Sequence, residues 1–189
     1  APANVQSVLG VAAGSGDIAS VAAISDLPAS SFADDGYGNA VLSTTVAHSL
    51  AEDYWKNEVI EQTHSLPIVT ASIDVEGGVA AFGFEMKGSL LEAFSPGDVK
   101  VLKVQRGSMD ETAFSYADRP GNYADGTYAI LSNGTTHMGT IAADDIYTLI
   151  LFVKDGGDYD LDTAKKSVMD PAVIVKTSSD TAEYPSSSS

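Results

Sequence analysis

The stretch YTLILFVKDGGDYDLDTAKKSVMDPAVIV, residues 147–175, is the part of this sequence that best indicates its fold. Residues 147–153 form an apolar run rich in β-branched and aromatic side chains, which are the residue types that suit a strand. A loop rich in Asp and Gly follows, and a second apolar run covers residues 172–175. The stretch therefore predicts strands on either side of an acidic loop.

The loop gathers four carboxylates, from Asp155, Asp158, Asp160 and Asp162, within eight residues. So much like charge is unfavourable unless solvent surrounds it or a cation shares it. The last three residues follow the one, three, five spacing of calcium loops, in which alternate oxygens converge on one hard cation. This spacing makes calcium the candidate cofactor of the loop.

The loop departs from an EF-hand at two positions. Its sixth position is Thr163, where an EF-hand has Gly, and its twelfth is Met169, where an EF-hand has a bidentate Glu. One interpretation is a calcium loop of another type, in which Asp155 or Asp170 supplies the missing oxygens. The other is a solvated acidic hairpin, which keeps the surface soluble and discourages pairing at a sheet edge.

Composition restricts the class of protein. The chain has 189 residues and is 44% hydrophobic, which is enough to bury a core in one large β domain or two small ones. Its net charge is −16, so a nucleic-acid or anionic-membrane partner is not expected, because both need a basic face. The sequence has no cysteine, which excludes disulfides and thiol chemistry, and no apolar run approaches the ~20 residues of a membrane span.

The N-terminal sequence suggests a compartment. The chain begins Ala1-Pro2-Ala3 without Met, as expected after a signal peptide is removed at a small-residue site. We therefore expect a bacterial protein that is secreted and works outside the cell or on its surface.

Three segments are expected along the chain. Residues 1–31 are rich in Ala, Gly and Ser, and predict either the first strands of the domain or an apolar arm. Residues 32–176 predict a β-sandwich domain with one helix at 44–62, where Thr44 or Thr45 could cap the helix and apolar residues recur at helical spacing. Residues 177–189 are Ser-rich and predict a linker.

The sequence pattern of the rest of the domain predicts short strands separated by turns. The apolar runs at 68–75 and 79–86 predict a hairpin around residues 76–78, and a strand at 99–104 is expected to carry its lysines on the outer face. Further strands are expected at 113–116 and 126–131. Strands at this spacing predict a mainly β fold, an antiparallel sandwich.

Residues able to carry catalysis are few. The three histidines, His48, His64 and His137, are not paired with a second ligand type at metal spacing and are interpreted as surface or core-edge residues. The sequence contains no Gly-x-Ser-x-Gly elbow and no phosphate-binding loop. We therefore do not expect an enzyme.

The acidic loop also supports a family resemblance. The runs DGGDYDLD at 155–162 and VMDP at 168–171 resemble the closing signature of the choice-of-anchor U type domain of secreted surface proteins from Synergistetes-like bacteria. The chain departs from that signature at Thr163, where the pattern has Gly, and at 165–167, where it has an Asn-Gly step. The resemblance covers roughly residues 99–175. It implies an exported β-sandwich module near the cell surface, with no known catalytic activity.

Two functions of different classes fit these observations. The first is a secreted structural protein whose copies assemble into an extracellular filament or layer, with the arm of one copy completing a sheet of the next by donor-strand exchange. The second is an extracellular module that binds carbohydrate or another surface ligand, which rests on fold analogy. The expected partners are accordingly copies of the same chain or a surface glycan.

Overall fold

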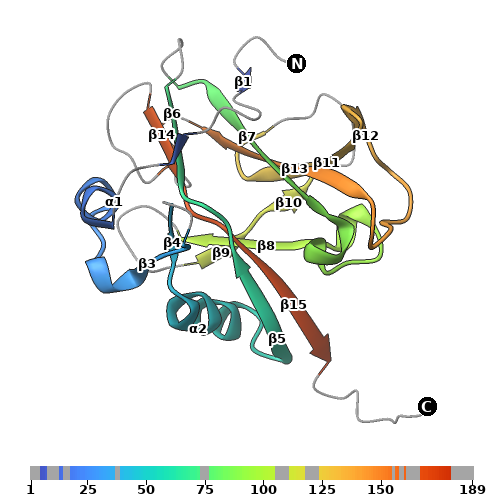
Figure 1. Cartoon of the computed structure of the whole chain (residues 1–189), viewed down its shortest axis with the longest axis horizontal. Helices are drawn as coiled ribbons and strands as arrows, with labels where there is room; N and C mark the ends of the chain where they lie inside the picture. The colour runs from blue at the N-terminus through green and yellow to red at the C-terminus, as the bar shows by residue number, and fades with distance from the viewer. Residues whose placement is uncertain are drawn as a thin grey trace.

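The computed structural model of the chain has a mainly β, sandwich-like fold (Figure 1). The structure describes residues 5–7, 13–14, 18–36, 39–72, 77–104, 111–117, 124–154, 156–157, 160 and 167–179. Its strands form two larger sheets and two small ones, and most strand pairs are antiparallel. The predicted mainly β sandwich is thereby confirmed.

The first sheet has the expected strand at its centre. Its strands, in spatial order, are β1 (Val5–Ser7), β7 (Val79–Lys87), β13 (Ile146–Lys154), β11 (Thr127–Ser132) and β10 (Ser115–Tyr116), and β12 (Thr135–Thr136) also pairs with β11. β13 contains the apolar run that indicated the fold from the sequence. The two short strands β1 and β10 pair in parallel with β7 and β11, and the other pairs are antiparallel.

The second sheet is antiparallel throughout. Its order is β5 (Glu58–Ser65), β15 (Val173–Ser179), β8 (Lys100–Val104) and β9 (Glu111–Ala113). A small sheet joins β14 (Ser167–Asp170), β6 (Val69–Ser72) and β2 (Ala13–Gly14), and another joins β3 (Phe32–Asp34) and β4 (Ala40–Leu42). The first three residues of the predicted C-terminal linker, 177–179, are therefore part of β15.

The described residues contain two α-helices, where one was predicted. The second, α2 (Thr44–Tyr54), begins after Ser43, whose Oγ accepts a hydrogen bond from the Val46 N–H at 3.2 Å. It ends well before residue 62, because residues 58–65 form β5 and pair with β15. Tertiary pairing thus overrides the helical spacing of residues 59 and 60.

The additional helix, α1 (Ile18–Ser25), lies where the sequence suggested an arm or first strands. Val21 and Ser25 face inward at helical spacing, and the Ser25 hydroxyl donates to the Val21 carbonyl oxygen. The short 3₁₀ helix η1 (Ala29–Ser31) follows. Two more, η2 (Gly88–Leu91) and η3 (Pro96–Asp98), connect β7 to β8.

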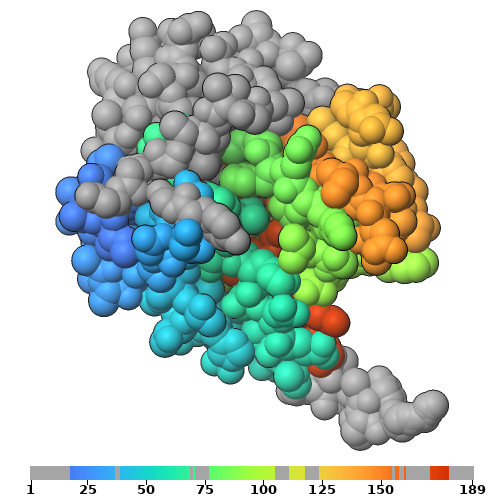
Figure 2. Space-filling view, viewed as in Figure 1, coloured from blue at the N-terminus to red at the C-terminus, as the bar shows by residue number. Residues whose placement is uncertain are grey.

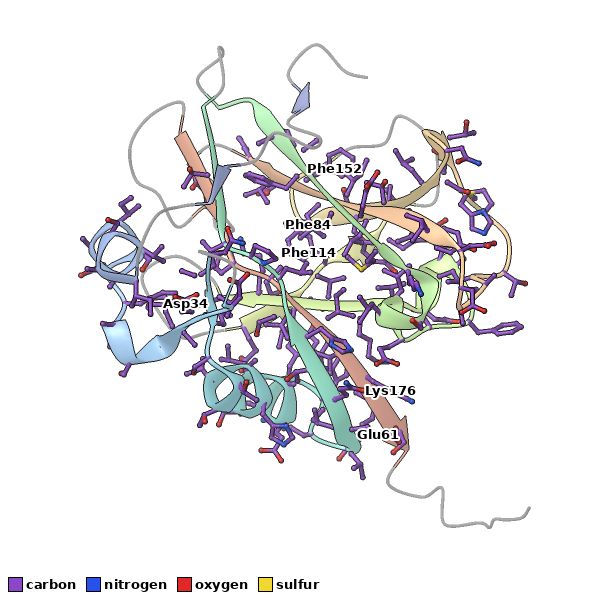
Figure 3. All side chains as sticks on the ribbon, in the orientation of Figure 1. Asp34, Glu61, Phe84, Phe114, Phe152 and Lys176 are labelled. Carbon is purple, nitrogen blue, oxygen red and sulfur yellow. The ribbon has the colours of Figure 1, made fainter. Side chains whose placement is uncertain are left out.

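The described residues form three apolar cores, of which the smallest, on the first sheet, includes Val79, Ala81, Ala129, Ile150 and Phe152. The inter-sheet core lies between the two larger sheets and includes Phe82, Phe114, Tyr128, Leu149, Leu151 and Ile174, with Phe84 packed against it (Figure 3). The helix-side core lies between the second sheet and the helices and includes Val21, Leu42, Leu50, Leu102, Val173 and Val175. Adjacent residues of β15 therefore belong to different cores.

Two local predictions were wrong. The runs around residues 68–75 and 79–86 do not form a hairpin, because β6 pairs with β14 and β2 whereas β7 pairs with β13 and β1. Lys103 does not lie on an outer face but is fully buried. The reason is that β8 is an interior strand of the second sheet, with β15 and β9 on its two sides and an apolar core on each face.

Candidate functional site

A cleft opens between the two larger sheets, where the end of β5 faces the second half of β7. Residues 63–67 form one wall, residues 84–86 form the other, and Leu90 and Ile174 complete the lining. The volume of this β5–β7 cleft is about 530 Å³. Figure 2 shows the surface hollowed between the teal β5 segment and the green β7 segment, with red atoms of β15 between them. Most of the lining of this cleft is apolar and includes Leu66 and Met86. The cleft is therefore suited to binding an extended, uncharged segment of polypeptide.

The wall formed by β7 is also a sheet edge. On one side, all nine residues of β7 pair with β13. On the other side, β1 pairs only with Val79, Ala80 and Ala81. Among the described residues, no strand pairs with 82–87 on that side, so the backbone there can accept a further strand.

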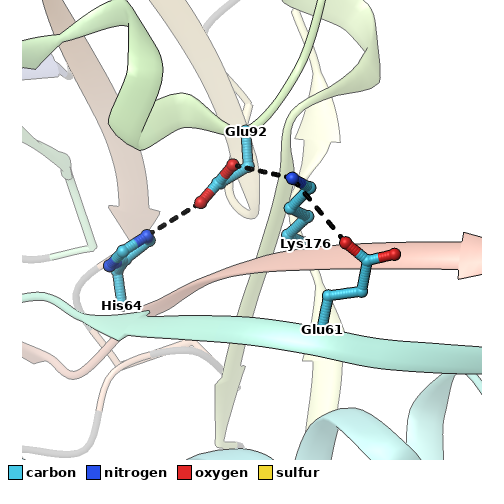
Figure 4. A network of polar contacts seen from close by, with 4 residues as sticks. All are labelled: Glu61, His64, Glu92 and Lys176. Atoms are coloured by element: carbon cyan, nitrogen blue, oxygen red, sulfur yellow. Dashed lines mark hydrogen bonds and ion pairs between the residues drawn. The ribbon is translucent and has the colours of Figure 1, made fainter.

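A polar network at the rim of the cleft joins β5 and β15 of the second sheet to Glu92, which follows η2 (Figure 4). His64 on β5 lies with its Nε2 3.0 Å from Glu92 Oε2. Lys176 on β15 places its Nζ 3.9 Å from Glu92 Oε1 and 3.6 Å from Glu61 Oε1. Glu92 is only 13% exposed whereas Lys176 is 47% exposed, so the contact between His64 and Glu92 is the better shielded of these interactions.

Glu92 reaches this position through its backbone conformation. It ends η2 with φ of 54° and ψ of 35°, in the left-handed region that few non-glycine residues adopt. This turn directs the carboxylate toward β5 and β15. Beyond it lies a second cleft of about 420 Å³, the η2 cleft, whose lining includes Ser89, Glu92, Phe94 and Lys176.

The predicted calcium ligands fall mostly outside the described residues. Asp155, Asp158 and Asp162 lie there, and Asp170 is described only as a backbone position in β14. Asp160 is fully buried, and its Oδ2 accepts a hydrogen bond from the Gly156 N–H at 2.9 Å. This contact closes the turn after β13, so one of the five carboxylates has a backbone partner. Calcium binding stays a prediction.

The other two histidines do not join the network. His48 lies on α2 with Nε2 3.3 Å from Glu52 Oε2, and its side chain is 45% exposed. His137 contacts the carbonyl oxygen of Thr140 through Nε2, at 2.9 Å. Both match their interpretation as surface or core-edge residues. His64 is partly buried and matches it too, but it also lines a cleft and contacts a shielded carboxylate.

Two buried polar side chains occupy the inter-sheet core. Lys103 has its Nζ 5.8 Å from the centroid of the Phe114 ring. The Tyr128 hydroxyl donates to the Pro96 carbonyl oxygen at 2.7 Å. Burial, and secondarily the neighbouring Tyr116 and Asp98, raise the pKa of the Tyr128 phenol well above its usual range. Tyr128 therefore acts as a neutral structural donor.

Comparison with known proteins gives no family, since no family model, no curated protein and no solved structure matches this chain. The described residues contain no group of three or more His, Cys, Asp or Glu side chains placed to hold a metal ion. None of their helices is long and apolar enough to cross a membrane.

Little in the sequence indicated this site. His64 and Glu92 are 28 residues apart, and the pairing of β1 with β7 joins segments more than 70 residues apart. The available signals were the alternation of Phe82, Phe84 and Met86, which marks one buried face, and the uncharged composition of residues 1–16. Neither signal identifies which edge is left open.

Proposed function

We propose that this protein is a structural subunit of the bacterial cell exterior, and that its copies assemble into a filament or layer through their N-terminal strands. The observation that carries the proposal is the edge of β7, on which the part of the chain that the structure describes places β1 beside three of nine residues. An exposed edge of this kind is a template for a strand from another chain. The proposal assigns the protein no catalytic role.

The N-terminal segment has the properties of such a strand. Both β1 and β2 lie at sheet edges, on β7 and β6, and neither is more than three residues long. Residues 1–16 carry no charged side chain, in a chain whose net charge is −16. Copies with this much negative charge repel one another, so contact through an uncharged segment is favoured.

Exposed apolar side chains supply a second reason to expect self-association. Four of them lie at one end of the first sheet, in the connection after β7, in the connection between β12 and β13, and at the first residue of β13: Leu90, Phe94, Met138 and Ile146. Phe94 is 75% exposed. Apolar surface concentrated at one end of a molecule is typical of a contact surface.

The same end of the molecule favours a second candidate, an extracellular module that binds carbohydrate. Phe94 borders the η2 cleft, which also contains the polar side chains of Ser89, Glu92 and Lys176. An aromatic face beside hydrogen-bonding groups is a suitable arrangement for a sugar ring. Glycan-array binding that Phe94→Ala abolishes would favour this candidate, whereas unchanged binding or none would count against it.

The test of self-assembly compares the whole chain with a variant that lacks residues 1–16. The deletion spares α1, whose Val21 belongs to the helix-side core. Sedimentation velocity and negative-stain electron microscopy should show ordered assemblies of the whole chain and folded monomers of the variant. Whole chains that stay monomeric at high concentration would refute the proposal. Assemblies formed equally well by the variant would refute the role of the N-terminal strands.

A further inference from the structure

The unpaired part of the β7 edge coincides with the wall of the β5–β7 cleft. Residues 84–86 belong both to the stretch that β1 leaves unpaired and to the lining of the cleft. Phe82 and Met86 are buried in the inter-sheet core, and Phe84 packs against it. A strand added here would gain backbone hydrogen bonds from the edge and would cover an apolar wall.

The observed pairing sets the direction and register in which such a strand continues. β1 runs parallel to β7, with Val5 beside Val79 and Ser7 beside Ala81. In the same register, residues 8–12 would lie beside 82–86, over about 16 Å at ~3.3 Å per residue. Val8, Gly10 and Ala12 would then share the face of Phe82, Phe84 and Met86. Small residues at these positions would leave room for the large side chains already in the cleft.

While β2 is in place, the chain's own arm cannot follow this register as far as Lys87. Continued along β7, the register puts residue 13 beside Lys87, but Ala13 lies beside Thr70 on β6. Figure 1 shows β2 and β6 on the side of β7 away from its end at η2. An arm that does not have to reach β6 of the same chain can follow the register along the whole edge.

We propose that the edge of β7 from Phe82 to Met86, with the β5–β7 cleft, is the acceptor groove for the N-terminal arm of a second copy of this chain. This rests on the proposed function and names its docking site. The exchanged arm pairs five additional residues with β7 and gives up the two pairs of β2. Each copy donates its arm at one place and accepts at another, and such head-to-tail contacts build filaments or rings.

The experiment uses cysteine pairs, because the chain has no cysteine of its own. The proposed register puts Val11 beside Glu85, which is exposed, within the Cα separation that a disulfide allows. Isotopically labelled Val11→Cys protein is mixed with unlabelled Glu85→Cys protein under mild oxidation, and linked peptides are counted by mass spectrometry. The control partner is His48→Cys on α2, which is also exposed. Sedimentation velocity of the same variants under reducing conditions reports assembly separately.

The proposal expects on the order of tenfold more linkage of residue 11 to residue 85 than to residue 48, since docking raises the local concentration of the two thiols. Assembly without preferred linkage to residue 85 would overturn the groove and leave self-association standing. Absence of both would overturn the groove and the proposed function together. A double variant, Val11→Cys with Glu85→Cys, that closes a disulfide within single chains would show the arm pairing in its own molecule and would also overturn the proposal.

Discussion

Replacing Tyr128 with Phe tests the packing of the inter-sheet core at a single atom. Tyr128 is 1% exposed, and its hydroxyl donates to the Pro96 carbonyl oxygen at 2.7 Å. The variant keeps the ring and its contact with Tyr116, whose centroid is 5.5 Å away, but leaves a buried acceptor without this donor. Losing such a bond costs about 1–2 kcal/mol of unfolding free energy. For a chain of this size, the melting temperature should fall by about 2–8 °C.

Two probes make the measurement specific. Far-UV circular dichroism follows the sheets, and the fluorescence of Trp55, the only tryptophan, follows the helix-side core against which it packs. Tyr54→Phe is the matched control, since Tyr54 is 43% exposed and its substitution should change stability by less than ~0.5 kcal/mol. Both probes should report the same loss in the Tyr128 variant if the two cores unfold together.

The same variant should respond differently to alkaline pH. Because the pKa of Tyr128 is raised in the folded protein, the unfolded chain loses this proton first as the pH rises. The stability linked to Tyr128 is therefore fully present below pH ~10 and decreases above it, by up to about 1.4 kcal/mol per pH unit. Tyr128→Phe lacks this group, so the stability difference between the two proteins should shrink above pH ~10. A difference that stays constant to pH 11.5, or no loss of stability at pH 7, would refute the assigned burial and hydrogen bond.

Three further changes test other parts of the structure. Gly88→Ala should unfold the protein or displace η2, because a Cβ there would lie 2.1 Å from the Ala142 carbonyl oxygen, whereas Gly139→Ala, with its nearest contact at 3.9 Å, should melt as the native protein does. Ser43→Ala should cost about 1 kcal/mol in urea unfolding through loss of the α2 cap, and Ser43→Thr should restore most of it; equal losses would contradict the cap. If the acidic loop binds calcium, adding calcium after chelation should raise the melting temperature of the native protein but not that of Asp160→Asn, and an unchanged native melting temperature would refute calcium binding.

Strands with a clear period were predictable from the sequence, and their partners were not. The run at 147–153 lies within β13, because β-branched and aromatic residues buried on both faces leave few alternatives. The end of α2 was misjudged because Val59 and Ile60 fit a helical stripe as well as a strand. Only pairing with β15, more than 110 residues away, decides between these structures.

The candidate site was less predictable, because it depends on contacts between distant segments. Lys103 looked like an outer-face residue since lysines usually are, and only the position of β8 inside its sheet explains its burial. His64 was indistinguishable by sequence from His48, although one lines a cleft and the other lies on an exposed helix face. The acidic loop was predicted as a calcium site from its composition and its one, three, five spacing, and neither determines where its oxygens point.

The position of β15 has a mechanical consequence. This strand lies inside the second sheet, with β5 on one side and β8 on the other, and its alternate residues belong to the two different cores. Tension applied at Ser179 along the strand axis would load the interstrand hydrogen bonds together, because these bonds run perpendicular to antiparallel strands. The three-residue pairing of β1 at a sheet edge shares such a load among far fewer bonds. Force applied to the two ends of one chain should therefore detach β1 from β7 before it extracts the C-terminal strand from the second sheet.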